Sequence, residues 1–294
     1  MKKRIETATS RTAKMTCLSR AASALEMDVF YKSGDFLAPL LLPDFFRLLF
    51  HIPLFRRGFM RSVAPRGIYE YVIARTKYID VVFQEALEEK LAQILIFGAG
   101  FDTRALRFVH LSSHTRIFEL DAAPTQQAKI GQYRKRHLDL PPNLTFIPID
   151  FNKEVLSKKL IQAGFKQGVR SLVILEGVLM YLTPGAVDKT MRTIRDFIGH
   201  GSRVVFDFVH QSVLDERNSQ REEMEIKKVV ADAGEQWQFG IETGKVADFL
   251  KNYDLNLVDL SDHTDLEKRF FTDPSGHVVV NVNGSHSLVT AEKV

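Results

Sequence analysis

The sequence predicts an α/β fold built on a mostly parallel sheet, and three observations support this. Residues 92–107 read as a buried strand, a Gly-x-Gly turn and the start of a helix. From there on, apolar segments of strand length alternate with helical segments. Several predicted strands also end in Asp or Glu, at the edge where open α/β sheets bind ligands. The hydrophobic content of 45% is that of an ordinary globular protein.

The basic charge of the chain is concentrated near its beginning. The net charge is +4 and the pI is about 9.0, but residues 1–20 alone hold six basic side chains and one acid. The rest of the chain is close to neutral, so we expect no broad basic face and no nucleic-acid partner. An organelle transit peptide is an alternative for this arm. The single cysteine, Cys17, rules out an internal disulfide, and we expect a cytoplasmic protein.

Residues 37–55 form the most apolar long segment. Pro39, Pro43 and Pro53 interrupt it and Asp44 adds a charge, so it cannot cross a bilayer as one regular helix. We therefore expect no stable membrane insertion. Within the segment, residues 45–50 predict a short hydrophobic helix. Two roles stay open for it: packing onto the core, or an active-site lid with an apolar wall for the substrate.

Residues 67–90 predict one or two amphipathic helices that lead into the first strand. Arg75 lies in this region. An arginine here is commonly solvated or paired with a neighbour such as Asp80, and its planar guanidinium also suits a carboxylate ligand.

A cofactor site is predicted at the Gly-x-Gly turn. Gly98 and Gly100 follow a continuously apolar strand and let the backbone approach a ligand without a Cβ atom. About twenty residues later Asp121 ends the next strand, a layout that grips the ribose of a nucleotide-like cofactor. Thr103 replaces the third glycine of the dinucleotide fingerprint and Asp102 crowds the place of a pyrophosphate, which disfavours a dinucleotide.

Seven strands are predicted, and the last two are separated by a loop rather than a clear helix, so the final strand is expected to be antiparallel. Their expected ranges are 92–97, 115–120, 144–149, 171–176, 202–209, 255–260 and 277–282.

Five sequence pieces, taken in order, resemble the leucine carboxyl methyltransferase-like family of class I S-adenosylmethionine-dependent methyltransferases, which includes many bacterial proteins assigned as O-methyltransferases. The resemblance covers roughly residues 10–262. The pieces are RTKYID (75–80), GAGFDTRALRF (98–108), FELDAAPTQQAK (118–129), IDF (149–151) and LEGVLMYLTP (175–184).

The resemblance implies a Rossmann-like core with S-adenosylmethionine as cofactor. The core would be a seven-stranded, mostly parallel sheet over residues 91–294. Residues 1–90 would form an N-terminal helical lid region of the same domain.

The resemblance also implies cofactor contacts for individual residues. Arg75 would meet the methionyl carboxylate of the cofactor, and Asp121 would accept the two ribose hydroxyls. Glu176, at the end of a buried strand, needs a positive partner, which the methionyl ammonium would provide. We assign Glu119 as a buried partner of the Gly-x-Gly turn.

Asp150 and Phe151 follow the third strand, where the family usually has Asp-Leu. The acid would accept from the adenine amino group while Phe151 covers the ring. The alternative for Asp150 is an N-cap of the next helix. Tyr181 and its two neighbours resemble the family's substrate-side loop, with core packing as the alternative.

The function implied is in-line methyl transfer to an oxygen of a small molecule or peptide. A carboxylate is ionised at neutral pH and needs no base, whereas a phenol or alcohol does. No residue stands out as an obligatory base, which favours a carboxylate or acidic hydroxyl. His210, after the fifth strand, is read as structural. His263, His277 and His286 lack metal-ligand spacing, so no metal is expected. A degenerate cofactor-binding scaffold and, less favoured, an NAD-dependent oxidoreductase stay open as alternatives.

Overall fold

The structure is a computed structural model that describes residues 8–151, 153–215, 221–232 and 234–294. Lys2, Lys3 and Arg4 of the predicted basic arm lie outside the described residues. In the described part of the chain no helix is both long and apolar enough to cross a membrane.

The centre of the fold is a seven-stranded sheet with the order β3-β2-β1-β4-β5-β7-β6. Strands β1 to β5 run parallel, and β7 is antiparallel to both β5 and β6. The strands are β1 (Gln93–Phe97), β2 (Arg116–Asp121), β3 (Leu144–Pro148), β4 (Ser171–Leu175), β5 (Arg203–Val209), β6 (Leu255–Ser261) and β7 (His286–Lys293). The predicted seven-stranded, mostly parallel sheet is confirmed.

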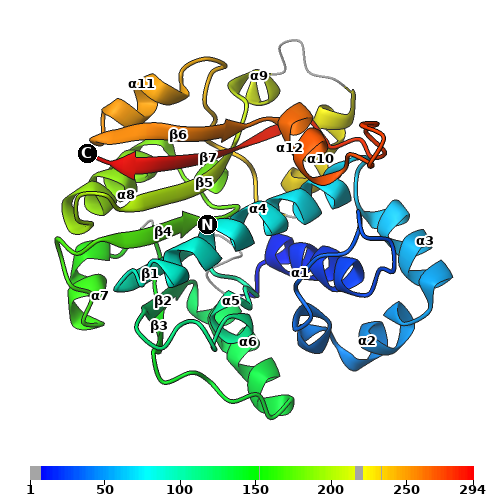
Figure 1. Ribbon diagram of the computed structural model, residues 1–294, viewed down its shortest axis with the longest axis horizontal. Coiled ribbons are helices and arrows are strands. Elements are labelled where there is room, and N and C mark those ends of the chain that lie inside the picture. The colour runs from blue at the N-terminus through cyan, green and yellow to red at the C-terminus, as the bar shows by residue number, and fades with distance from the viewer. Residues whose placement is uncertain (1–7, 152, 216–220, 233) are drawn as a thin grey trace.

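Helices cover both faces of this sheet (Figure 1). Side chains along β1 alternate between the faces, as strand geometry requires: Ile94 and Ile96 pack toward one layer of helices, Leu95 and Phe97 toward the other. The first layer holds α4 (Ile68–Glu88) and α12 (His263–Phe270); the second holds α7 (Leu156–Gln162), α8 (Pro184–Phe197) and α11 (Val246–Lys251). Residues buried on both faces explain the unbroken apolar runs of the central strands.

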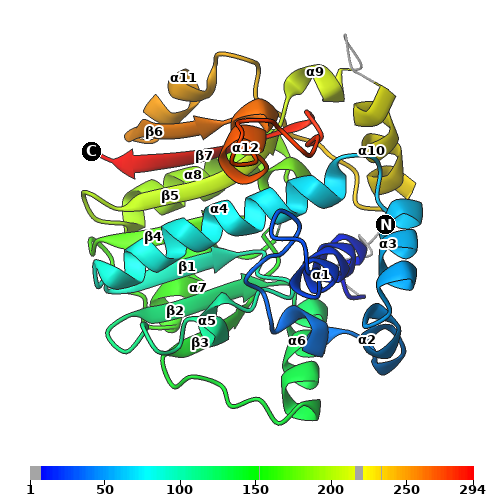
Figure 2. The same ribbon diagram turned by 45° about the vertical axis from the view of Figure 1, so that its right-hand side comes forward.

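The helices that precede α4 gather at one end of the sheet, beside the edge where β1 and β4 finish (Figure 2). They pack with α6 around a small core of their own that includes Leu41, Phe50 and Tyr133. These elements are α1 (Arg11–Ala24), the 3₁₀ turn η2 (Ala38–Leu41), α2 (Asp44–Phe50), α3 (Pro53–Val63) and α6 (Ala123–Lys135).

The remaining helices are short or lie near the same end of the sheet. They are α5 (Arg104–Arg107), the 3₁₀ turn η3 (Leu179–Tyr181), α9 (Gln211–Leu214) and α10 (Arg221–Asp232). The helix predicted after the Gly-x-Gly turn is therefore only α5, a single turn.

Two predictions near the C-terminus are wrong. The last strand is β7, His286–Lys293, and residues 277–282 form a loop whose Val278 and Val279 are largely exposed. The connection before it contains a helix, α12, which Asp262 and Asp265 begin with a capping box. A segment becomes a strand of this sheet only if it pairs with neighbouring strands. The β-branched residues at 277–282 have strand propensity but do not pair with β5 and β6, so propensity alone predicted the wrong segment. The predicted antiparallel direction of the final strand is correct.

Candidate functional site

The Gly-x-Gly turn leaves β1 with two residues in the left-handed region. Gly98 has φ of 56° and Gly100 has φ of 50°. A Cβ atom on Gly98 would lie 2.6 Å from Cγ2 of Val178, and one on Gly100 would lie 3.3 Å from Cβ of Ala13. The left-handed backbone angles favour glycine at both positions, and the close approach of Val178 adds a steric reason at Gly98.

Asp121, at the end of β2, holds this turn in place. Its Oδ2 accepts a hydrogen bond from the amide of Gly100 at 2.5 Å, and its Oδ1 accepts one from the amide of Ala122 at 2.6 Å. Burial raises the pKa of Asp121 to about 6, although both amide hydrogen bonds oppose the rise. An ionised carboxylate has about four acceptor positions, so two remain for hydroxyl donors of a ligand.

Glu119 does not contact the turn, so its predicted partner is wrong. Its side chain is buried and its Oε2 lies 2.5 Å from Nζ of Lys129, on α6. Glu119 and Asp121 lie two positions apart on one strand, and a hydrogen bond from Gly100 reaches only the later one. Burial raises the pKa of Glu119 to about 7, with the charge of Lys129 opposing the rise.

Glu176, directly after β4, lies between two buried arginines. Nε of Arg75 is 3.0 Å from its Oε1, and Nη1 of Arg104 is 2.8 Å from its Oε2. Nη1 of Arg75 also lies 2.7 Å from Oδ2 of Asp207. The positive partners that a buried Glu176 requires are thus present in the chain itself. Arg75 pairs with these acids rather than with Asp80.

The charges of the neighbouring arginines keep Glu176 and Asp102 ionised. Burial acts to raise the pKa of Glu176, but the charges of Arg104 and Arg75 outweigh it and lower the pKa. The same balance lowers the pKa of Asp102, whose main cation is Arg104, 2.5 Å away. Asp80 binds the Nε of Arg104 at 2.7 Å. Asp102 and Arg104 therefore fix the loop after the glycines.

Asp150 and Phe151 lie just beyond β3. The ring of Phe151 stacks on Phe97, with ring centroids 5.7 Å apart. The carboxylate of Asp150 lies 3.2 Å from Nζ of Lys153. It does not cap α7, which begins at Leu156 with Val155 in the N-cap position. Asp150 is therefore not the N-cap of α7, and the helix start expected near Asn152 lies outside the described residues.

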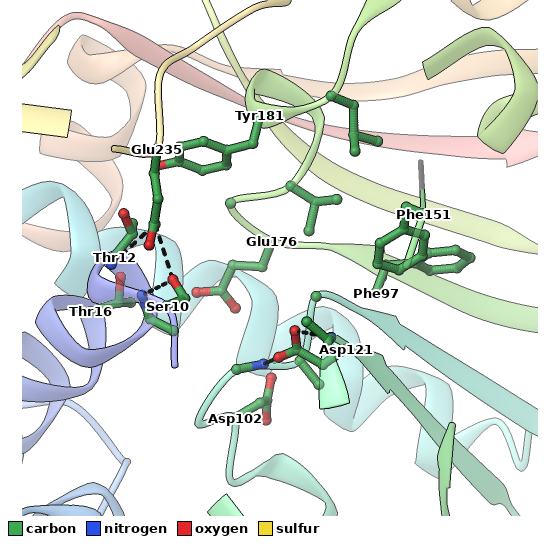
Figure 3. A pocket seen from close by; sticks show the side chains of 18 of the residues that line it. Ser10, Thr12, Thr16, Phe97, Asp102, Asp121, Phe151, Glu176, Tyr181 and Glu235 are labelled. Carbon is green, nitrogen blue, oxygen red and sulfur yellow. Dashed lines mark hydrogen bonds between the residues drawn. The ribbon is translucent and has the colours of Figure 1, made fainter. Parts of the chain in front are cut away.

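One cavity of about 760 Å³ brings all the predicted cofactor residues together. It lies at the carboxyl ends of the parallel strands, where the topology of such sheets places ligands. The predicted residues that line it are Arg75, Gly98, Gly100, Asp121, Asp150, Phe151 and Glu176. Figure 3 shows Phe97 and Phe151 on one side of this cavity, Asp121 and Glu176 near its middle, and Ser10, Thr12 and Glu235 on the other side.

The lining is rich in acids. The acidic side chains are Asp102, Asp121, Asp150, Glu154, Glu176 and Glu235, and the basic ones are Arg20, Arg75 and Lys159. Such a lining disfavours a diphosphate and suits a ligand that carries positive charge. Together with the glycine turn and the free acceptor positions of Asp121, the residues present fit a sulfonium nucleoside. Asp121 would hold its ribose, and Asp150 and Phe151 its base.

The cavity is covered by α1, which Glu235 ties to the body of the protein. The carboxylate of Glu235 accepts hydrogen bonds from the amides of Arg11 and Thr12, at 2.7 and 3.2 Å, and from the hydroxyl of Ser10 at 3.0 Å. At the same helix, Arg20 donates to the carbonyl of Phe101 at 2.8 Å. A carboxylate at a helix N-terminus satisfies amides that have no partner within the helix.

Of the two roles left open for residues 37–55, the structure shows core packing. No residue of 37–55 lines the described cavity; the segment packs around Leu41 and Phe50 instead. Ser10, Glu235 and His286 line the cavity and were not predicted as site residues. Glu235 has no local sequence signal, and His286 was considered only as a metal ligand. Tyr181, predicted for the substrate side, does line the cavity.

The sequence model of the leucine carboxyl methyltransferase family matches residues 16–195. A "putative S-adenosyl-L-methionine-dependent methyltransferase", YktD of Bacillus subtilis (strain 168), is 26% identical over 200 residues, 68% of this chain and 66% of that protein. A Mycobacterium marinum protein (strain ATCC BAA-535 / M) with the same description is 34% identical over 146 residues. That alignment spans 48% of this chain and 46% of the relative.

Two solved structures resemble the whole fold. A "putative methyltransferase" from Thermobifida fusca YX superposes with a TM-score of 0.59 at 16% identity, over 96% of this chain and 97% of the other. A DUF574 family protein from Streptomyces avermitilis MA-4680 does so with a TM-score of 0.60 at 12% identity, over 99% and 100%. With this sheet order, they confirm the class I methyltransferase fold.

The family match confirms the predicted resemblance. Both named relatives are described as dependent on S-adenosyl-L-methionine, which supports the predicted cofactor. The family's sequence model matches more than half of the length of this chain, and the chain therefore belongs to the leucine carboxyl methyltransferase family.

Proposed function

We propose that the protein is an S-adenosylmethionine-dependent methyltransferase that methylates an oxygen of a small molecule or peptide by in-line displacement. The observation that carries the proposal is the single cavity that gathers Arg75, the glycine turn, Asp121 and Glu176 at the ends of the parallel strands. Its volume of about 760 Å³ falls within the range of ligand sites. The methyl group of a sulfonium is already activated, so the main tasks left to the protein are alignment and exclusion of water.

Different elements bind the cofactor and cover the cavity in this proposal. The strand ends carry the cofactor residues, and α1 closes the cavity through Glu235. We infer that residues 1–90 contain the lid and belong to one domain with the core at 91–294. Within that region α1 would be the covering element.

Methylation of oxygen is supported by the family's name, which describes transfer to a carboxyl group. The two alternatives lose support. The excess of carboxylates in the lining opposes the diphosphate of NAD. A degenerate scaffold does not require intact cofactor residues, yet one cavity is lined by Gly98, Gly100, Asp121 and Glu176.

The experiment is a transfer assay with S-adenosylmethionine labelled in its methyl group, run against separate pools of carboxylic acids, phenols and alcohols, and amines. Treatment with alkali releases methanol from methyl esters and leaves ethers intact, so it separates the two oxygen products. We expect label in an oxygen pool with the wild type and none with Asp121→Ala. Label only in the amine pool contradicts the oxygen assignment. Cofactor binding with no transfer to any pool supports the scaffold alternative.

A further inference from the structure

His286 occupies a position at the ligand-binding edge of the sheet that no prediction used. It is the first residue of β7 and pairs in register with Val209, the last residue of β5. Because β7 runs antiparallel to β5, its start lies at the same edge as the end of β5 (Figure 1). The side chain is 6% exposed and lines the cavity described above.

Two aromatic rings hold the imidazole in place. Tyr71 stacks on it with ring centroids 4.7 Å apart, and Trp237 meets it edge-on at 5.2 Å. The hydroxyl of Tyr71 donates to Asp207 at 3.0 Å, and the guanidinium of Arg75 pairs with the same carboxylate. His286 therefore lies beside the Arg75 and Glu176 cluster, with little freedom to rotate.

A chain of hydrogen bonds fixes which ring nitrogen carries the proton. The side-chain amide of Asn283 donates to the carbonyl of Arg66 at 3.1 Å, so its Oδ1 faces Ser285. That Oδ1 accepts from the amide of Ser285 at 3.0 Å and from its hydroxyl at 2.5 Å. The hydroxyl has only one proton to give, so towards Nδ1 of His286, 2.6 Å away, it must act as acceptor. Nδ1 is then the protonated nitrogen.

The other nitrogen, Nε2, is left with a lone pair. It makes no hydrogen bond to any described residue and is not sealed from solvent. Burial, followed by the charge of Arg75, lowers the pKa of His286 to about 3, so the ring is neutral at physiological pH. A neutral acceptor in an acid-rich cavity suits a partner that donates a hydrogen bond, and it repels a carboxylate.

We propose that His286 is an acceptor-binding residue: its Nε2 receives a hydrogen bond from a neutral hydroxyl of the methyl acceptor and takes that proton during transfer. This rests on the proposed function and narrows it from oxygen acceptors in general to hydroxyl compounds, in contrast to the carboxyl group in the family's name. It also names the base that the sequence did not reveal.

A lone pair of the hydroxyl oxygen forms the bond to the methyl carbon, which breaks the carbon–sulfur bond and leaves its electron pair on sulfur. Positive charge develops on the oxygen, so its proton becomes far more acidic than that of the free hydroxyl. An imidazole of low pKa can therefore accept it at Nε2 and then release it to water. The products are a methyl ether and S-adenosylhomocysteine.

The first test is nuclear magnetic resonance of the protein labelled with ¹⁵N-histidine, with the signals of His286 assigned from their loss in His286→Phe. We expect a protonated Nδ1 and an unprotonated Nε2 in the free protein. In protein saturated with S-adenosylhomocysteine, phenol should shift the Nε2 resonance, and benzoate, which lacks the donor, should leave it in place. A protonated Nε2, or a larger shift with benzoate than with phenol, overturns the proposal.

A second test measures phenol-pool methylation and cofactor affinity on the same variants. His286→Phe keeps the ring on Tyr71 but lacks the nitrogens, and we expect at least a tenfold loss of rate with S-adenosylhomocysteine affinity within about twofold of the wild type. His277→Phe, at an exposed histidine, is the matched control and should behave as the wild type. An unchanged rate in His286→Phe overturns the proposal. Failure of the wild type to bind S-adenosylhomocysteine would instead refute the proposed function, and the free protein would still report the protonated nitrogen.

Discussion

On one side of the cavity, the glycine turn and the carboxylate that holds it are close in sequence: Gly100 and Asp121 are 21 residues apart. On the other side, the hydroxyl of Ser10 meets the carboxylate of Glu235 across 225 residues. The first side is built from one strand, its turn and the neighbouring strand, supported by buried ion pairs. The second is assembled from the first described helix and a segment beyond α10. The difference teaches that the cofactor class of such a site can be inferred from short sequence pieces, whereas the side covered by α1 depends on long-range packing.

The largest effect is expected from breaking the ion pairs under the cofactor side. Arg104 is completely buried and contacts Asp102, Asp80 and Glu176. Arg104→Met removes the cation of the buried Asp102, whereas Glu176 keeps Arg75 and Asp80 keeps Arg107. We expect a loss of about 3–5 kcal/mol in the free energy of unfolding, measured by urea denaturation.

The matched control is Arg192→Met. Arg192 pairs with Asp188 on the surface of α8, with a side chain 54% exposed, so the expected change is under about 1 kcal/mol. Equal, small losses in both variants would show that the cluster does not stabilise the cofactor side.

A smaller effect, on cofactor affinity, is expected from protonating Asp121. The ordinary pKa of an Asp is 3.8, and in the folded protein that of Asp121 is about 6. Between these values the folded state binds the extra proton, so this group alone makes the free protein less stable as pH rises through that window. In the proposed complex, the cofactor hydroxyls would donate hydrogen bonds to the ionised form of Asp121. Affinity for S-adenosylhomocysteine should therefore fall about tenfold from pH 7 to pH 5, measured by calorimetry.

Asp121→Asn separates this cause from other titrations. The variant should bind weakly with little change across the same pH range, because its amide does not ionise. A wild-type affinity that stays constant, or an equal pH dependence in the variant, would mean that Asp121 is not the group responsible.

The smallest effect is expected on the covering side. Glu235→Ala removes the acceptor of the first amides of α1 but leaves Ser10 as the N-cap, so we expect a local loss of about 1 kcal/mol. Hydrogen exchange at Arg11 and Thr12 should become about fivefold faster. Glu242→Ala, at an exposed acid further along the chain, should leave these amides unchanged. Equal exchange rates in the two variants would show that Glu235 does not stabilise the start of α1.

These two sides also explain what the sequence could predict. The sheet, the turn and the acids after β2, β3 and β4 depend on local patterns, and the structure brings them to one cavity. Either Glu119 or Asp121 could have been the partner of the glycine turn. The answer depends on which strand position Gly100 faces, and the amino-acid sequence does not reveal this position. The last strand was misplaced because Val278 and Val279 have strand propensity, whereas pairing with β5 and β6 selects residues 286–293. Glu235 and His286 reach the cavity only through tertiary contacts.

The most direct test of the central claim, that this cavity holds a sulfonium nucleoside on Asp121, is a calorimetric titration. S-adenosylmethionine, S-adenosylhomocysteine and NAD would be titrated into the wild type, Asp121→Ala and the exposed control Asp139→Ala. We predict micromolar binding of the first two ligands to the wild type and the control, a loss of at least tenfold in Asp121→Ala, and no binding of NAD. Binding of NAD, or sulfonium binding that is equal in all three proteins, would contradict the account.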